Sequence, residues 1–200
     1  MIIALSAAAA AVSVTHLAAC GLGRQRLRYL TKLMLMPLVC GLYMALTGKP
    51  SLVVVAAMLC GWAGDWFMIY KHREAFLAAG MAAFGLGHIF YVAHIGVLAA
   101  EAQPRLFTVL AAILLPGAIA LSVFFALRTR IPKELRLPGL LYGLLLASLG
   151  SAAFIGLRAG APGAGCLLVG ACLFLCSDGI LAFETVSYTH LRAHETCADL

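Results

Sequence analysis

Seven apolar runs, each of roughly 20 residues, follow one another through most of this chain, and a helix of that length crosses the hydrocarbon of a lipid bilayer. Only 11% of the residues are charged, against roughly 25% in soluble domains. We therefore predict an all-α fold, a polytopic transmembrane helix bundle with seven spans. The runs extend over Ile2 to Cys20, Tyr29 to Thr47, Ser51 to Ile69, Ala75 to Ala99, Leu106 to Leu127, Pro138 to Leu157 and Gly163 to Phe183.

The connections between the runs are short and contain Gly and Pro, as at 48–50 and 103–104. None is long enough to separate two domains, so we predict a single transmembrane helical domain over residues 1–185. The first run has an alternative, because residues 17–20 (LAAC) resemble a lipoprotein cleavage box. We predict a retained helix, since no basic residue precedes the run and arginines follow it.

If each run crosses the membrane, successive loops lie on alternate sides of it. Lysine and arginine are distributed unevenly between these two sides. The loops after the first, third and fifth runs contain ten when Lys32 at the start of the second run is counted with them, and those after the second, fourth and sixth contain three. By the positive-inside rule, the amino terminus lies outside and odd-numbered helices run inward. The Ala, Gly, Leu and Arg content is compatible with a bacterial gene, so we expect a bacterial cytoplasmic membrane. We therefore interpret the excess of Lys and Arg over Asp and Glu as a signal of membrane topology, and we predict no nucleic-acid partner.

Two aspartates, Asp65 and Asp178, lie inside apolar runs, where a charged group costs about 2.5–3.5 kcal/mol even on lenient insertion scales. Asp65 lies fourteen residues past Ser51 and Asp178 fifteen past Gly163. Both are therefore about 21–23 Å from the outer ends of helices that run in the same direction. We predict one common depth near the cytoplasmic surface. They are either a functional pair or structural polar contacts between helices.

The fourth run contains the other polar groups of interest. Gly80, Phe84, Gly87, His88 and Tyr91 recur at intervals of three and four, so they share one face suited to close helix packing. We expect His88 to lie about 10 Å deeper than the aspartates. It either supports a reaction or forms a neutral hydrogen bond to a neighbouring helix.

Lys32 begins the second run on the predicted cytoplasmic side. Its ammonium either extends to the lipid head groups or meets the aspartates or a lipid phosphate at the same level. The seven cysteines show no CxxC or Cys/His ligand spacing, so we predict no disulfide framework and no metal site.

Four short segments occur in order along these runs. They are YLTK (29–32), Gly64-Asp65, the stretch from Phe76 to Tyr91 and SDGILA (177–182). On these helices and in this order they resemble the YhhN/TMEM86 family of lysoplasmalogenases. The resemblance covers most of the chain up to about Thr185.

The resemblance implies an eight-helix membrane enzyme without a cofactor, whose partners are a lysophospholipid and membrane lipids. It would hydrolyse the vinyl ether bond of lysoplasmalogens to a fatty aldehyde and a glycerophospho-ethanolamine or -choline. One protonated carboxyl would protonate the vinyl carbon, and an ionised one would stabilise the cation and activate water. We assign this pair to Asp65 and Asp178 without deciding between the roles. His88, Lys32 and Tyr91 are supporting candidates.

The same acids allow two other functions. A small proton-coupled transporter would use them as a relay, although no internal repeat is detectable in the sequence. A noncatalytic membrane scaffold would tolerate Asn or Ala at both positions.

Residues 186–196 need a separate explanation. VSYTHLRAHET reads as the conceptual translation of a transposase sequencing adapter. We therefore predict that native sequence ends around Thr185, that residues 186–200 are a non-native tail and that the family's eighth helix is lost. The alternative is a polar cytoplasmic tail.

Overall fold

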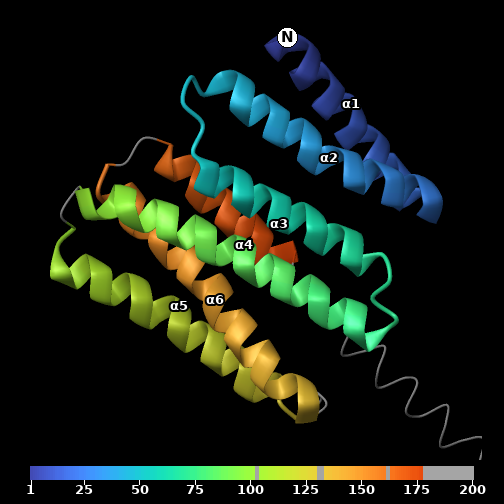
Figure 1. Cartoon of the computed structure of the whole chain (residues 1–200). Helices are drawn as coiled ribbons and strands as arrows, with labels where there is room; N and C mark the ends of the chain where they lie inside the picture. The colour runs from blue at the N-terminus through green and yellow to red at the C-terminus, as the bar shows by residue number, and fades with distance from the viewer. Residues whose placement is uncertain (102–103, 130–132, 161–162, 178–200) are drawn as a thin grey trace, which may run out of the picture. The chain divides into compact units, whose positions relative to one another are not determined.

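The computed structural model of the chain describes residues 1–101, 104–129, 133–160 and 163–177. These residues form seven helices (Figure 1), which confirms the predicted all-helical membrane fold. The helices are α1 (Ile2–Gly21), α2 (Gln25–Leu46), α3 (Leu52–Met68), α4 (Glu74–Glu101), α5 (Leu106–Leu127), α6 (Lys133–Arg158) and an unlabelled helix, Ala164–Ser177. Asp178 and the adapter-like segment lie outside the described residues, so the predicted limit of the domain at residue 185 stays a prediction.

Five of the helices in the described part of the chain, α1, α2, α4, α5 and α6, are long and apolar enough to cross a membrane. α3 has 17 residues and is about 25 Å long, so it is somewhat shorter than the hydrocarbon is thick. The described part of the helix Ala164–Ser177 is apolar and also shorter. The chain is thus a polytopic helical membrane protein.

Two helices begin four or five residues before the predicted apolar runs. α2 begins at Gln25, four residues before Tyr29, and α6 begins at Lys133, five residues before Pro138. Hydropathy cannot detect these first turns, because they contain Arg, Gln and Lys, which are nevertheless good helix formers. All the other described limits agree with the predicted ones to within two residues.

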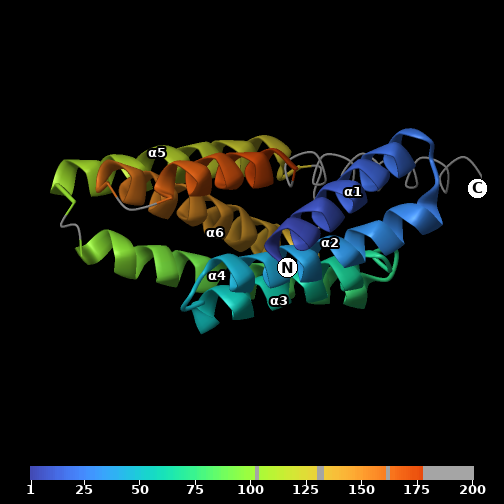
Figure 2. The same ribbon diagram turned by 90° about the horizontal axis from the view of Figure 1, so that it is seen from above.

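The chain contains two compact units, residues 1–94 and residues 95–200, and each is described by itself. In the first unit α1 packs on α2 and α2 packs on α3. Figure 2 also shows these helices as neighbours. In the second unit α5 packs on α6. Gly150 of α6 faces Leu175, so the helix Ala164–Ser177 packs there as well.

Glycines allow α3 and α4 to approach each other closely within the first unit. A Cβ atom at Gly87 would lie 3.0 Å from the carbonyl oxygen of Ala57, and one at Gly64 would lie 2.9 Å from the ring of Phe84. Gly80 faces Met68 in the same way, at 3.3 Å. The predicted packing face of the fourth run is confirmed for its glycines. Because Gly64 precedes Asp65, this contact also fixes the part of α3 that carries the carboxylate.

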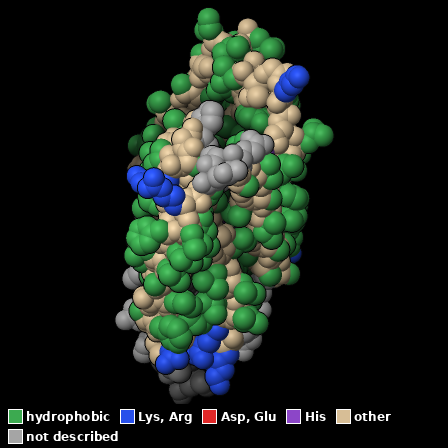
Figure 3. Space-filling model, turned by 90° about the vertical axis from the view of Figure 1, so that its left-hand side faces the viewer, with side chains coloured by type: hydrophobic (Ala, Val, Ile, Leu, Met, Phe, Trp, Pro, Cys, Tyr) green, Lys and Arg blue, Asp and Glu red, His purple; other side chains and the backbone are tan. Residues whose placement is uncertain are grey.

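Large apolar side chains remain exposed along most helices. On α5, for example, Phe107 is 81% exposed and Leu114 is 66% exposed. Figure 3 shows hydrophobic side chains over most of one face, interrupted by a few groups of Lys and Arg. A soluble monomer rarely exposes apolar surface on this scale, whereas a helix in lipid is expected to.

The close contact of α3 and α4 predicts that a glycine-to-alanine substitution lowers stability at this contact but not at an open position. Gly87→Ala should destabilise the protein by about 1–3 kcal/mol, because the Ala57 carbonyl belongs to a helix backbone and cannot turn aside. Gly41→Ala is the matched control, since its Cβ would meet only Leu5 at an ordinary 3.9 Å. Thermal unfolding in detergent measures both. Equal midpoints for the two variants would contradict the close approach of α3 and α4.

Candidate active site

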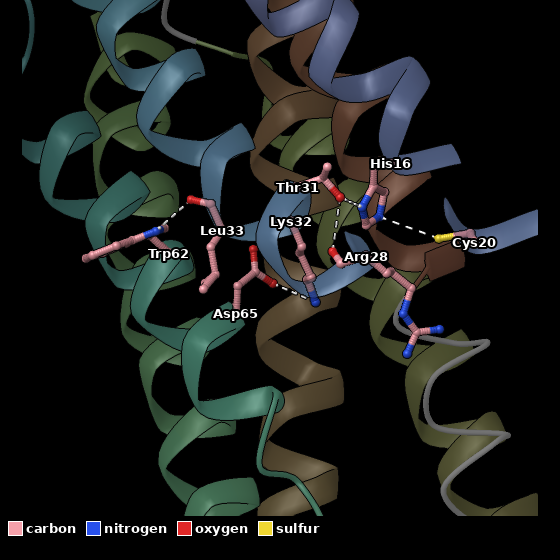
Figure 4. Close-up of polar contacts among 8 residues, drawn as sticks. All are labelled: His16, Cys20, Arg28, Thr31, Lys32, Leu33, Trp62 and Asp65. Carbon is pink, nitrogen blue, oxygen red and sulfur yellow. Dashed lines mark hydrogen bonds and ion pairs between the residues drawn. The ribbon is translucent and has the colours of Figure 1, made fainter. Parts of the chain in front are cut away.

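Asp65 forms an ion pair inside the first unit. It lies on α3, three residues before that helix ends at Met68. The Lys32 ammonium of α2 lies 2.9 Å from its Oδ1 atom (Figure 4). The Asp65 side chain is 15% exposed and that of Lys32 is 39% exposed. The carboxylate is therefore largely covered, while the ammonium keeps one open side.

The α2–α3 hairpin explains why these two charges meet. Lys32 lies fourteen residues before α2 ends at Leu46, and Asp65 lies thirteen residues after α3 begins at Leu52. Both are therefore about 20 Å from the turn that joins the helices. Because α2 packs on α3, equal distance from the turn brings the two side chains to one level.

A proline in α2 helps to set the register of this hairpin. Pro37 has no N–H group, so the carbonyl of Leu33, four residues earlier, lacks its usual partner within the helix. The Trp62 indole of α3 donates a hydrogen bond to that carbonyl, with 3.0 Å between Nε1 and the oxygen. Leu33 is next to Lys32, and Trp62 lies one turn before Asp65. This bond thus holds the two helices together beside the ion pair.

A second polar contact joins α1 to α2 at the neighbouring residue. The buried Thr31 hydroxyl donates a hydrogen bond to the carbonyl of Leu27 (2.7 Å), and its oxygen lies 2.9 Å from Nδ1 of His16. The Thr31 hydroxyl thus lies between a backbone carbonyl of its own helix and the His16 imidazole of α1. Cys20 Sγ lies 3.7 Å from Nε2 of His16. The residues on either side of Lys32 thus contact different helices, Thr31 contacting α1 and Leu33 contacting α3.

His88 and Tyr91 lie at a different level of the unit. His88 is buried, and its Nδ1 atom bonds to the carbonyl of Phe84 in its own helix. Its neighbour Gly87 faces Ala57, which precedes Asp65 by eight residues, or about 12 Å along α3. Tyr91 is half-buried one turn farther along α4, near Cys40 of α2. The structure therefore brings Lys32, but not these two side chains, to the level of Asp65.

Asp178 lies outside the described residues, immediately after the described part of the helix Ala164–Ser177. Its pairing with Asp65 therefore stays a prediction. Across residues 1–101, 104–129, 133–160 and 163–177, no group of three or more His, Cys, Asp and Glu side chains is arranged to hold a metal ion.

Two contacts of the site were not predicted from the sequence. The bond of Trp62 to Leu33 could have been suspected, because Pro37 four residues after Leu33 frees a carbonyl inside an apolar run. The bond of His16 to Thr31 has only a weak signal, a histidine and a threonine near the same ends of two consecutive runs.

Comparison with known proteins assigns the chain to a family. Residues 27–198 match the YhhN family. The chain belongs to the YhhN family. The match includes Lys32, Asp65 and His88, while His16 lies before it.

Three curated relatives carry the name lysoplasmalogenase TMEM86B. The mouse protein is 30% identical over 142 residues, which are 71% of this chain and 55% of the relative. The human protein is 31% identical over 151 residues (76% and 59%), and the rat protein is 31% identical over 143 residues (71% and 53%). The chain thus spans little more than half the length of these relatives. No solved structure matches the chain.

The Trp62 contact predicts a specific coupling between α2 and α3. Trp62→Phe should cost about 1–2 kcal/mol of stability, because it leaves the Leu33 carbonyl without a donor. In a Pro37→Ala background the same change should cost less, since alanine restores a backbone N–H that can satisfy that carbonyl within α2. Thermal unfolding of the four proteins in detergent measures the coupling. The same cost in both backgrounds would contradict this role of Trp62.

Proposed function

We propose that this chain hydrolyses the vinyl ether bond of lysoplasmalogens, with Asp65 as one of two catalytic carboxyls. The observation that carries the proposal is the pairing of Asp65 with Lys32 inside a membrane protein of the YhhN family. The relatives named lysoplasmalogenase support the substrate class. A lysoplasmalogen is itself a membrane lipid, so it can reach such a site from within the bilayer.

The position of Asp65 along α3 suits this substrate. The vinyl ether is attached directly to the glycerol, so it lies where the head groups meet the hydrocarbon. Asp65 lies three residues, or about 5 Å, from the end of its helix, which is the corresponding depth. In the orientation we propose, with the amino terminus outside a bacterial cytoplasmic membrane, this end faces the cytoplasm.

The pairing with Lys32 supports a definite division of roles between the two acids. A carboxylate bonded to an ammonium is suited to stand beside a cation and to accept a proton from water, rather than to donate one. We therefore assign Asp65 as the carboxylate and Asp178 as the general acid.

The proposed reaction has three steps. Asp178 protonates the vinyl carbon β to the ether oxygen, and the electrons of the double bond form the new C–H bond, which leaves an oxocarbenium ion beside Asp65. Water then adds to the cationic carbon while Asp65 accepts its proton, giving a hemiacetal. The hemiacetal separates into the fatty aldehyde and the glycerol hydroxyl of the head-group product. The proton returns from Asp65 to Asp178 through water.

The other two candidates have smaller parts in this proposal. His88 lies about two turns from the level of Asp65, toward the middle of the bilayer, and Tyr91 lies one turn farther along α4. That depth corresponds to the alkenyl chain of the substrate rather than to its vinyl ether. We expect their substitution to affect binding of the chain more than the chemical step.

Asp65→Asn should lower aldehyde release from a lysoplasmalogen in isolated membranes by at least about 100-fold, because the amide cannot accept a proton from water. Asp178→Asn should do the same, because the amide cannot donate one. Glu101→Gln, at the far end of α4, is the matched acid-to-amide control and should leave the rate unchanged. Protein amounts in the membranes are compared by immunoblot.

The pH dependence of the residual rates then tests the two roles. A required carboxylate makes the rate fall at low pH, and a required acid makes it fall at high pH. Asp65→Asn should lose the fall at low pH, and Asp178→Asn should lose the fall at high pH. A rate like that of the unchanged protein in either variant would refute the paired-acid proposal. Solute flux into liposomes without hydrolysis would instead favour the transporter.

A further inference from the structure

The Lys32 ammonium has bonding capacity that its ion pair does not use. An ammonium group has three N–H donors, and the contact with Asp65 Oδ1 needs one of them. The Lys32 side chain is 39% exposed while that of Asp65 is 15% exposed. The two remaining donors are therefore available to an anion that approaches from outside the protein.

A second cation lies on the same face of α2. Arg28 precedes Lys32 by four residues, a spacing that places their Cβ atoms about 5–6 Å apart. Its side chain is exposed, and its guanidinium lies 5.5 Å from the centre of the Tyr29 ring. Figure 4 shows the Arg28 and Lys32 side chains extending in the same general direction. Together they form what we call the basic pair.

The sequence offers this pair almost no acidic partner. Asp65 is the first acidic residue of the chain, and the next is Glu74. Four basic residues precede Asp65 at this end of α2, namely Arg24, Arg26, Arg28 and Lys32. Like charges four residues apart destabilise a helix, so one carboxylate leaves a surplus of positive charge that a bound anion would offset.

The distance between Asp65 and the Lys32 ammonium fits the distance between the vinyl ether and the phosphate of a lysophospholipid. Five single bonds of its glycerol separate the vinyl ether oxygen from the phosphorus, which is about 6 Å when extended. Asp65 Oδ1 lies 2.9 Å from the Lys32 ammonium, and an ammonium–phosphate hydrogen bond adds about 2.8 Å. A phosphate bound to Lys32 thus leaves the vinyl ether within reach of Asp65.

We propose that Lys32 and Arg28 bind the phosphate of the lysophospholipid, with Lys32 bridging that phosphate to Asp65. The inference rests on the proposed function for the identity of the lipid. On this proposal the bound phosphate, and not the alkenyl chain alone, positions the scissile bond beside Asp65. A lipid of the same chain length without a phosphate should therefore bind and react poorly.

Binding can be measured without any reaction. The probes are 1-O-hexadecylglycerophosphoethanolamine, whose saturated ether cannot undergo the reaction, and 1-O-hexadecylglycerol, which lacks the phosphate. The purified full chain in a nonionic detergent should bind the first at least about tenfold more tightly. Arg28→Gln and Lys32→Gln should each remove most of that preference and leave the affinity for 1-O-hexadecylglycerol unchanged.

Arg26→Gln is the matched control, because Arg26 is an exposed arginine two residues from Arg28 and so lies on a different face of α2. It should keep the preference for the phosphate lipid. If Arg26→Gln lost as much of this preference as Arg28→Gln, the preference would come from general surface charge, and the proposal would be overturned. Arg28→Gln changes no contact of Asp65, so it also separates phosphate binding from a structural role of Lys32.

Competition by inorganic phosphate distinguishes a site for the phosphate of a lipid from a site for free phosphate. We expect millimolar inorganic phosphate to leave lipid binding intact, because the lipid also buries its chain. Strong competition at that concentration would show a site for free phosphate and overturn the lipid assignment.

Turnover separates this proposal from the proposed function. With an alkenylglycerophosphoethanolamine, Arg28→Gln should raise KM about tenfold or more, while the already poor turnover of 1-alkenylglycerol stays as it is. Asp65→Asn should lower turnover of both by at least about 100-fold. If the unchanged chain binds the phosphate lipid selectively but hydrolyses neither substrate, the hydrolase proposal fails and the phosphate site stands. Equal losses on both substrates in Arg28→Gln would overturn the phosphate site.

Discussion

A carboxylate within a membrane helix persists only where a nearby group offsets its charge, and for Asp65 that group is Lys32. The rest of the site depends on this pair. Lys32 and Asp65 come from consecutive helices and meet because each is about 20 Å from the turn between them. A short connection and regular helix geometry therefore suffice to place two opposite charges together near one end of the hairpin.

The surrounding contacts hold the pair at that level. On one side Trp62 bonds to the carbonyl that Pro37 leaves free, and on the other His16 bonds to Thr31. The absence of a side chain at Gly64 lets α4 approach the helix that carries Asp65. Each contact satisfies a polar group or fills a space that would otherwise be costly within a bilayer. The same contacts that stabilise the bundle thus orient the candidate reactive groups.

The sequence predicted the helices well, because a span of hydrocarbon sets both their length and their composition. The limits of α5 were predicted to the residue, whereas the first turn of α2 was missed because its residues are charged. The position of Asp65 along α3 followed from counting, but its partner did not. Lys32 had two equal interpretations, since only the rotation of α2 about its axis decides whether an ammonium faces lipid or a neighbouring helix. The pairing with Asp178 stays a prediction.

The central claim is that the chain hydrolyses a vinyl ether by protonating carbon, with Asp65 as the carboxylate. The most direct measurement is the mass of the fatty aldehyde released from a lysoplasmalogen in deuterated water and trapped at once. Transfer of a deuteron to the vinyl carbon predicts one deuterium beside the carbonyl, and at least about 100-fold less aldehyde from Asp65→Asn. Aldehyde without deuterium, or the same labelled aldehyde from Asp65→Asn, would contradict the account.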